Sequence, residues 1–468
     1  MRRVWPALLA FFGIACIAAA ITVPLFLVPL LRVVPLDLDI TSDASTVAPQ
    51  GSAGERFPAV IMDRCSLKAA KARTLHAHLT QQRRSVIVDP SDSRQATVQS
   101  AQTVRIDRTR DAAGKESTPA KPTANGTLAC DDGLLTASID RVSLNRKTSV
   151  PNGTVSSLQL EAAPQGVDVK DVSVALPDRK GFQYKFGFGV KKRDYLVYDT
   201  TTRQNVPAKY TAEKTIDGVT TYEFVATVPE ADLSSLPDAQ GAAALGTMLT
   251  MPAKWWGITG RGVTPTDQIT LHRYATAVRY MWVEPKTGTI INGREDQSVY
   301  FKSPDQSDDV PAAVRNYRIT ALKGTFQWSD DTISAQAARA KHYTGLLKLG
   351  NLWLPLILSI AGVLLLLIWT LTLRRSRRAD RGDHDPRDSA TQPESTDVDP
   401  VAASPVETAV AGTSAAGTDT AGTDTAETDA AGAHAAGTHV RANENQLWER
   451  PTQRIPRVVA PDSDSDNA

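Results

Sequence analysis

The sequence has few cysteines, few aromatic residues and almost no net charge. Of its 468 residues only 3 are cysteine and 6% are aromatic, and 52 basic side chains against 51 acidic ones leave a formal charge of +1. A chain so close to neutrality lacks the basic surface that attracts nucleic acid. It also contains no C-x-x-C pair, the usual pattern of a thiol redox centre. We therefore expect neither a nucleic-acid partner nor redox catalysis.

The usual motifs of enzymes are missing as well. The chain has no G-x-S-x-G, no Walker loop, no dinucleotide-binding glycine pattern and no H-E-x-x-H. His76 and His78 share a face only in a strand, and two imidazoles alone make a poor zinc site. Adjacent carboxylates such as Asp131 and Asp132 point to opposite faces of a strand, so they do not form a glycosidase pair by themselves. The sequence indicates a non-enzymatic protein without cofactor or metal ion.

What the chain does contain is two long apolar runs. The second, residues 352–373, has no charged residue, and its 22 residues at 1.5 Å each extend about 33 Å, enough for a hydrocarbon core of about 30 Å. Four arginines between positions 374 and 378 follow at once. Basic residues of this kind mark the cytoplasmic end of a membrane span. We predict a transmembrane helix over residues 352–373.

The first apolar run covers residues 4–31 and is preceded by Arg2 and Arg3. Ala18 and Ala20 would fit the cleavage site of a signal peptide, which is the alternative. The run, however, continues far beyond a signal core of 7–15 residues. We therefore predict an uncleaved anchor, with its two arginines and the later arginine cluster both in the cytoplasm. This makes a two-span plasma-membrane protein with both termini cytoplasmic.

The spans divide the chain into parts with different expected structures. They are a cytoplasmic end with its anchor (1–35), an extracytoplasmic domain (36–345), the second span (352–373) and a cytoplasmic tail (374–468). The tail contains repeats such as AGTDTAGTDTAETDAAGAHAAGTH. Such a composition buries too little apolar surface to offset chain entropy, so we predict that the tail is mostly disordered. Its partner, if it has one, is not identified by the sequence.

The patterns of the extracytoplasmic domain are mainly those of β-strands. In TTYEFVATV, apolar and polar residues alternate from Tyr222 to Val228, as expected for a half-buried strand. Asp217-Gly218 and Asn292-Gly293 are typical turn pairs, and in YMWVEPKTGTIINGRE a turn at Pro285 to Gly288 predicts a hairpin. We predict a large antiparallel β-rich domain, either barrel or sandwich, with one helix around 334–349 that runs into the second span.

Only two cysteines, Cys65 and Cys130, lie in the extracytoplasmic domain. Outside the cytoplasm such a pair tends to be oxidised. We predict that the two form a disulfide, with two free structural thiols as the alternative.

One stretch, MPAKWWGITGRGVTP, suggests a binding site. It places Trp255 and Trp256 beside a glycine-rich loop that carries Arg261. Aromatic faces stack on sugar rings or lipid headgroups, and an arginine fork holds phosphate or carboxylate. The alternative is that one tryptophan belongs to the core and the other to its rim.

Taken together, the opening MRRVWPALLAFFGIACIAAAITVPLFLVPLLRVVPLDLDI, the hairpins YLVYDTTTRQNVPAKY and YMWVEPKTGTIINGRED, and the late single span resemble the actinobacterial PorA-type "porin" family, formerly a domain of unknown function. The resemblance covers about residues 1–375. It implies a place in the envelope of a mycolate-bearing actinobacterium, and it implies either a porin or a role in maturation of lipoglycans such as lipomannan.

The residues themselves favour one of these two implied roles. A conventional porin needs a closed barrel with a lipid-facing apolar band or an oligomer of amphipathic helices, whereas both spans here are uniformly apolar. We therefore expect a non-enzymatic envelope protein whose outer domain binds or transfers lipid-linked glycans, or scaffolds the enzymes that synthesise them. A channel component is the alternative, and an unrecognised glycan-modifying enzyme comes third. The ligand and the oligomeric state do not follow from the sequence.

Overall fold

The computed structural model describes residues 4–48, 55–120, 130–159, 173–236 and 246–381. Helical segments are α1 (Val4–Thr22), η1 (Val23–Leu27), α2 (Val28–Leu31), η2 (Arg64–Lys68), η4 (Leu233–Ser235), α3 (Ala253–Trp256), α4 (Ala312–Arg315), α5 (Asp330–Lys348), η5 (Leu349–Trp353) and α6 (Leu354–Arg381). Strands are β1 (Asp39–Val47), β2 (Ala59–Met62), β3 (Thr74–Val88), β4 (Gln95–Arg110), β5 (Glu116–Ser117), β6 (Leu134–Asn145), β7 (Pro151–Gln159), β8 (Ser173–Ala175), β9 (Tyr195–Asp199), β10 (Gln204–Ile216), β11 (Val219–Asp232), β12 (Met248–Pro252), β13 (Gln268–Val283), β14 (Ile290–Lys302) and β15 (Arg318–Trp328).

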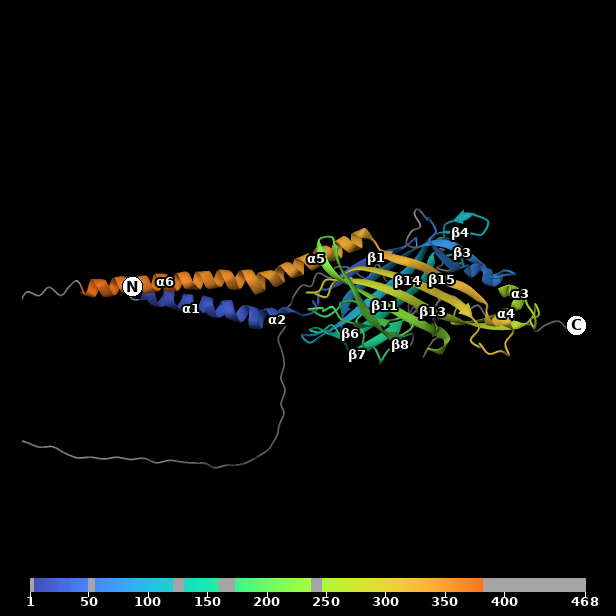
Figure 1. Cartoon of the computed structure of the whole chain (residues 1–468), viewed down its shortest axis with the longest axis horizontal. Coiled ribbons are helices and arrows are strands. Elements are labelled where there is room, and N and C mark those ends of the chain that lie inside the picture. The colour runs from blue at the N-terminus through green and yellow to red at the C-terminus, as the bar shows by residue number, and fades with distance from the viewer. Residues whose placement is uncertain (1–3, 49–54, 121–129, 160–172, 237–245, 382–468) are drawn as a thin grey trace, which may run out of the picture. The chain divides into compact units, whose positions relative to one another are not determined.

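All these strands belong to one 15-stranded sheet, visible between the helices in Figure 1. Its order is β8-β7-β6-β4-β3-β1-β15-β14-β13-β11-β10-β9, with β2, β5 and β12 paired beside this path. The central strands are long and pair antiparallel with sequence neighbours, as β13 does with β14. The prediction of a large antiparallel β domain flanked by two apolar helices is confirmed.

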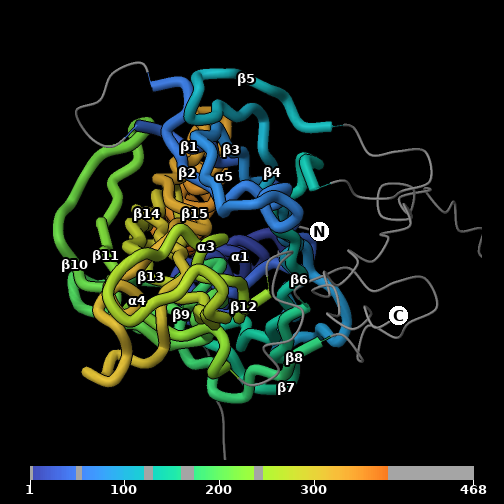
Figure 2. Tube along the Cα trace, turned by 90° about the vertical axis from the view of Figure 1, so that its right-hand side faces the viewer, coloured from blue at the N-terminus to red at the C-terminus, as the bar shows by residue number. Residues whose placement is uncertain are grey.

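The sheet is curled, so that strands far apart along it share one core. Leu79 on β3 and Leu271 on β13 belong to the same cluster of buried side chains, although three strands separate them in the sheet. The two end strands also meet, because Val174 on β8 and Tyr198 on β9 belong to one cluster of buried side chains. Phe182 bonds to both neighbours of Val197. Figure 2 shows the strands arranged around the centre of the domain, with β8 and β9 near each other.

Two turns of the sheet are built by the same contact. After β9, the N–H and hydroxyl of Thr202 both donate to the carboxylate of Asp199. After β13, the N–H and hydroxyl of Thr287 donate to Glu284 in the same way. All four residues are buried. Each carboxylate therefore satisfies donors that the turn would otherwise leave unpaired.

Of the two predicted turn pairs, one forms a turn and the other does not. Asp217 and Gly218 both have positive φ and join β10 to β11, as a tight hairpin turn requires. The prediction for Asn292-Gly293 is wrong, because this pair lies inside β14. A Cβ on Gly293 would lie 2.8 Å from the ring of Trp328. The glycine there makes room for an aromatic ring, which is the other common use of glycine in a strand.

The two apolar helices, Val4–Leu31 and the continuous run Asp330–Arg377, are both long enough to cross a membrane. They pack closely, since a Cβ on Gly13 would lie 2.9 Å from Leu366 and one on Gly362 would lie 2.7 Å from Ile17. A Cβ on Gly350 would likewise touch Val28. Higher numbers in one helix thus meet lower numbers in the other, so the helices run antiparallel.

As predicted, the late helix continues into the second apolar run. α5 is capped by Ser329, whose hydroxyl accepts a hydrogen bond from the N–H of Thr332, a common N-cap contact. Ala337 and Ala340 pack against Val219 and Ile291 of the sheet, and the chain then passes through η5 into α6. The predicted disorder of the tail concerns residues from 382 onward, which lie outside the described part.

Candidate ligand-binding site

The domain contains a cavity of about 160 Å³, here called the juxtamembrane cavity. It is lined by Val34, Pro35, Asp37, Leu38, Asp39, Ile40, Ser42, Arg83, Ser85, Val98, Leu144, Gln183, Tyr184, Lys185, Thr289, Ile290, Trp328, Gln336, Arg339 and Tyr343. These residues come from many parts of the chain, and they combine apolar walls with several charged groups. Binding sites for small ligands commonly have this composition.

Two walls of the juxtamembrane cavity adjoin the apolar helices. One wall is residues 34–42, which follow the end of α2 at Leu31 within a few positions. Another part of the wall is formed by Gln336, Arg339 and Tyr343 of α5, which leads through η5 into the second apolar helix. The cavity is therefore close in sequence to the ends of both apolar helices that adjoin the sheet domain.

Three basic side chains line the juxtamembrane cavity. Arg83 donates to the amide oxygen of Gln102 at 3.0 Å, and its guanidinium lies 5.9 Å from the ring centre of Tyr184. Arg339 donates to the backbone carbonyl of Asp39 at 3.1 Å. Lys185 donates to the backbone carbonyl of Phe186 at 3.1 Å. Among the described residues, none of the three cations forms a direct ion pair with a carboxylate.

Lys185 is the most perturbed of these groups. Burial lowers the pKa of its ammonium group to about 7, although the negative charge of Glu284 opposes this shift. Desolvation disfavours the charged form of a buried lysine. Its ammonium also donates to the carbonyl of Thr287 and lies 4.0 Å from the ring centre of Phe188. The lysine is therefore held in place by neutral groups, and its positive charge is only partly compensated by Glu284.

The wall around Tyr184 is fixed by a buried polar network. Asp140 forms an ion pair with Arg179 at 2.6 Å, and both side chains are almost fully buried. The hydroxyl of Tyr184 donates to Asp140 and accepts from the amide of Gln183 at 3.0 Å. This leaves the Oε1 atom of Gln183 buried without a donor from the described residues. The cavity wall thus offers an acceptor that a hydroxyl group of a ligand could satisfy.

A second charged cluster lies deeper in the sheet and is already paired. Arg279 on β13 contacts Asp199 at 2.6 Å and Glu295 at 3.1 Å. These two carboxylates raise the pKa of the Arg279 guanidinium even though the group is buried. The adjoining hollow measures about 20 Å³, which is room for one water molecule. This cluster is suited to joining β9, β13 and β14 rather than to holding a ligand.

The tryptophan pair of the sequence lies in the core at the far end of the sheet. Trp255 and Trp256 are 3% and 2% exposed, and their indole N–H groups donate to the carbonyls of Ser66 and Ile269. Arg261 is exposed in the loop that follows. Rings buried to this degree leave no face for a ligand, so the geometry favours a core role for both tryptophans, whereas the alternative drawn from the sequence placed one of them at the rim.

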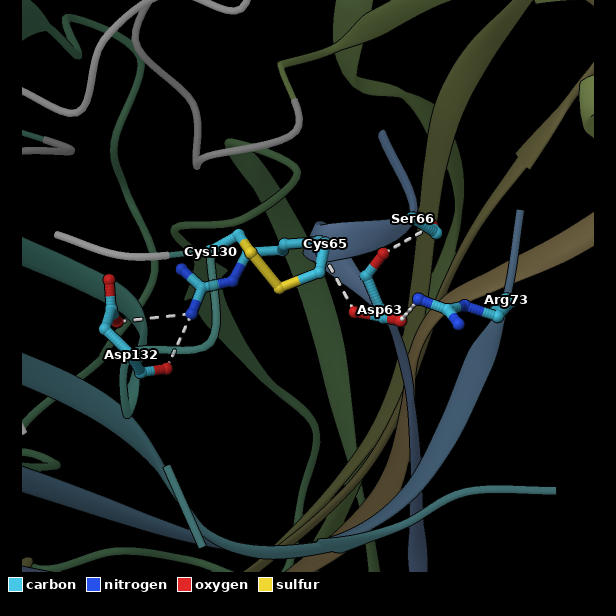
Figure 3. Close-up of a disulfide and its surroundings, with 7 residues drawn as sticks. Asp63, Cys65, Ser66, Arg73, Cys130 and Asp132 are labelled. Atoms are coloured by element: carbon cyan, nitrogen blue, oxygen red, sulfur yellow. Dashed lines mark hydrogen bonds and ion pairs between the residues drawn. A yellow bond between two sulfur atoms is a disulfide. The ribbon is translucent and has the colours of Figure 1, made fainter. Parts of the chain in front are cut away.

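Cys65 and Cys130 are joined by a disulfide, shown in Figure 3. Asp63 accepts a hydrogen bond from the N–H of Cys65 and forms an ion pair with Arg73 at 2.8 Å. Beside Cys130, the carboxylate of Asp132 is 3.2 Å from the buried guanidinium of Arg64. The bridge therefore lies in a polar cluster that ties η2 to the segment before β6.

A serine, a histidine and an aspartate meet near β13, but not in a catalytic geometry. The hydroxyl of Ser234 and the carboxylate of Asp232 both lie 2.8 Å from Nδ1 of His272. A nucleophilic triad needs the two partners on opposite ring nitrogens. Within the described ranges no group of three or more metal-ligating side chains occurs. No sequence pattern links Arg83, Lys185 and Arg339, which lie in three separate segments of the chain.

Comparison with known sequences gives consistent results. The family profile described as "Porin PorA" matches residues 5–371 of this chain. A protein named "Porin PorA" from Corynebacterium amycolatum is 29% identical over 406 residues, which cover 79% of this chain and 98% of that protein. Another of the same name from Corynebacterium resistens is 28% identical over 437 residues, covering 81% and 99%. These matches agree with the resemblance drawn from the sequence.

Proposed function

The chain belongs to the Porin PorA family, and from this premise we propose that it binds a lipid-linked glycan in the juxtamembrane cavity. It is an envelope membrane protein, and its role in this proposal is non-enzymatic: it holds or transfers the ligand, or presents it to the enzymes that build lipoglycans. The position of the cavity carries the proposal. Its walls directly adjoin both membrane helices, so a ligand anchored in the outer leaflet can enter without leaving the bilayer.

The proposal requires residues 36–345 outside the cytoplasm and both termini inside it. The antiparallel contact of Gly13 with Leu366 and of Gly350 with Val28 supports two spans of opposite direction. The arginines at both cytoplasmic ends support the orientation. In a Cys16→Ala background, a membrane-impermeant thiol reagent should label a cysteine placed at exposed Ser307 in intact cells, but not one placed at Ser414. The reverse labelling pattern would exclude this topology.

The ligand-binding role can be tested by filling the cavity. Ser42 lines it and is 8% exposed, so Ser42→Phe should occupy part of the space. Thr250→Phe on the exposed face of β12 is the matched control. In a deletion strain complemented with each variant, we expect normal protein abundance for both. Only the cavity variant should lose copurifying lipid and alter the lipoglycan profile. An unchanged lipid content and profile would refute the proposal.

A channel component is the second candidate, because relatives carry the name porin. The large apolar side chains exposed in the described residues lie on the two apolar helices, apart from Leu36, Leu196 and Met248. The sheet therefore lacks the apolar outer band of a membrane barrel. A pore of this protein would have to form between the helices of several copies. The test is the conductance of the purified protein in planar bilayers. A conductance that persists in the cavity variants would favour the channel over lipid binding.

A further inference from the structure

We propose that the juxtamembrane cavity recognises the phosphate group of a lipid headgroup, with Arg83, Lys185 and Arg339 as its binding residues. This inference rests on the proposed function and specifies the chemical group that the site would hold. The three side chains come from β3, from the segment before β9 and from α5, and all line the same cavity. A phosphate offers several acceptor oxygens and one or two negative charges to such a set of donors.

The first argument is the lack of ion-pair partners around the three basic side chains of the cavity. Buried charges are normally paired, because desolvation of an isolated ion costs several kcal/mol. Two buried arginines of this domain follow the rule, Arg179 with Asp140 and Arg279 with Asp199, whereas buried Arg273 donates to the backbone carbonyl of Gly246. The three cavity cations instead donate to the neutral oxygens of Gln102, Phe186 and Asp39. Arg83 and Arg339 are half-buried, and Asp37 and Asp39 also line the cavity, where Arg339 helps to lower the pKa of Asp39. An anionic ligand would therefore mainly compensate Lys185 and Arg83.

The size of the cavity is the second argument. Its volume of about 160 Å³ is close to that of engineered cavities that bind one benzene molecule. It can therefore hold a phosphate and a small adjoining group, but no acyl chain. The chains of the ligand would stay in the bilayer beside the apolar helices that lead to both walls. The buried acceptor of Gln183 would receive a hydroxyl of the group attached to the phosphate.

The position of the cavity decides between a lipid and a free phosphate. A soluble anion gains nothing from a site framed by residues 34–42 and by α5, where each wall continues into a membrane helix. A headgroup fixed to the outer leaflet is already concentrated at this height, so its binding loses less translational freedom. The chemistry recognised is the same, but the location favours the lipid-borne phosphate.

The test uses the full-length protein purified in an uncharged detergent. The probes are short-chain phosphatidic acid, the matching uncharged diacylglycerol and inorganic phosphate, with the ligand-dependent rise of Tm as the readout. We expect phosphatidic acid to bind at least about tenfold more tightly than diacylglycerol or inorganic phosphate. The combined variant Arg83→Gln, Lys185→Met and Arg339→Gln should lose this preference, whereas Arg105→Gln at an exposed position of β4 should keep it.

The outcomes separate this inference from the proposed function. Equal binding of phosphatidic acid and diacylglycerol would overturn phosphate recognition and leave lipid binding standing. Equal binding of phosphatidic acid and inorganic phosphate would show that the site does not require the phosphate to be carried by a lipid. If the combined variant misfolds, the single variant Lys185→Met decides, because it removes a buried charge and should fold. If both Lys185→Met and Arg339→Gln keep the preference for phosphatidic acid, the assignment of these side chains as phosphate-binding residues is overturned.

Discussion

The burial of Trp256 allows a quantitative prediction about the far end of the sheet. Its side chain is 2% exposed, contacts the rings of Trp255, Phe301 and Tyr317, and donates to the carbonyl of Ile269 at 3.0 Å. Truncation of a buried tryptophan to alanine costs about 3–5 kcal/mol. The unpaired carbonyl adds about 1 kcal/mol. The total approaches the whole stability of many domains, which is about 5–15 kcal/mol.

For Trp256→Ala we therefore expect the Tm of the purified full-length protein to fall by roughly 10 °C or more. The unfolding of the β-sheet is measured by circular dichroism. The cellular abundance should fall as well, because the unfolded fraction is removed by proteolysis. Trp353→Ala is the control, since this residue is 53% exposed on the apolar helix. A Trp256→Ala variant that unfolds within about 2 °C of the wild type would refute the core role. If that variant also lost lipid, the ring would bind ligand after all.

Three further predictions follow from other parts of the molecule. Replacing Cys65 and Cys130 by serine opens a loop of 65 residues and should lower stability by about 4 kcal/mol, so an unchanged Tm would contradict it. Gly362→Leu should separate the two membrane helices and lower the amount of intact protein, whereas Gly345→Ala, with nothing within 4 Å, should not. Lys185→Met should raise Tm more at pH 6 than at pH 10. Burial lowers the pKa of this lysine from 10.5 to about 7, so its penalty is full below pH 7 and fades toward pH 10.5; an equal gain at both pH values would refute the cause.

The features that the sequence predicted correctly depend on neighbouring residues. The length of an apolar run, the positive φ of Asp217 and Gly218 and the turn that follows Pro285 are decided within a few positions. The continuation of α5 into the second apolar helix follows from composition in the same way. Local signals can also mislead, as at Asn292-Gly293, where the ring of a distant tryptophan explains the glycine.

The features that the sequence did not predict depend on contacts between distant segments. Arg83 and Arg339 line one cavity only because the sheet curls and α5 returns to it. Likewise, two adjacent tryptophans beside a glycine-rich loop fit a binding surface or a core equally well. The decision between them rests on β2, β14 and β15, whose residues enclose both rings. No local pattern contains that information.

The helix that carries Arg339 continues from the cavity, through the π-helical segment η5, into the second apolar run. Residues Asp330 to Arg377 form one helical run. Arg339 and Tyr343, which line the cavity, lie in its first part. A helix transmits rotation along its axis, because its hydrogen-bonded turns resist twisting. A turn of the membrane segment therefore moves one wall of the cavity against Arg83 on β3. By reciprocity, we expect a ligand in the cavity to restrain that rotation, so that the orientation of the apolar helix would respond to the occupancy of the cavity.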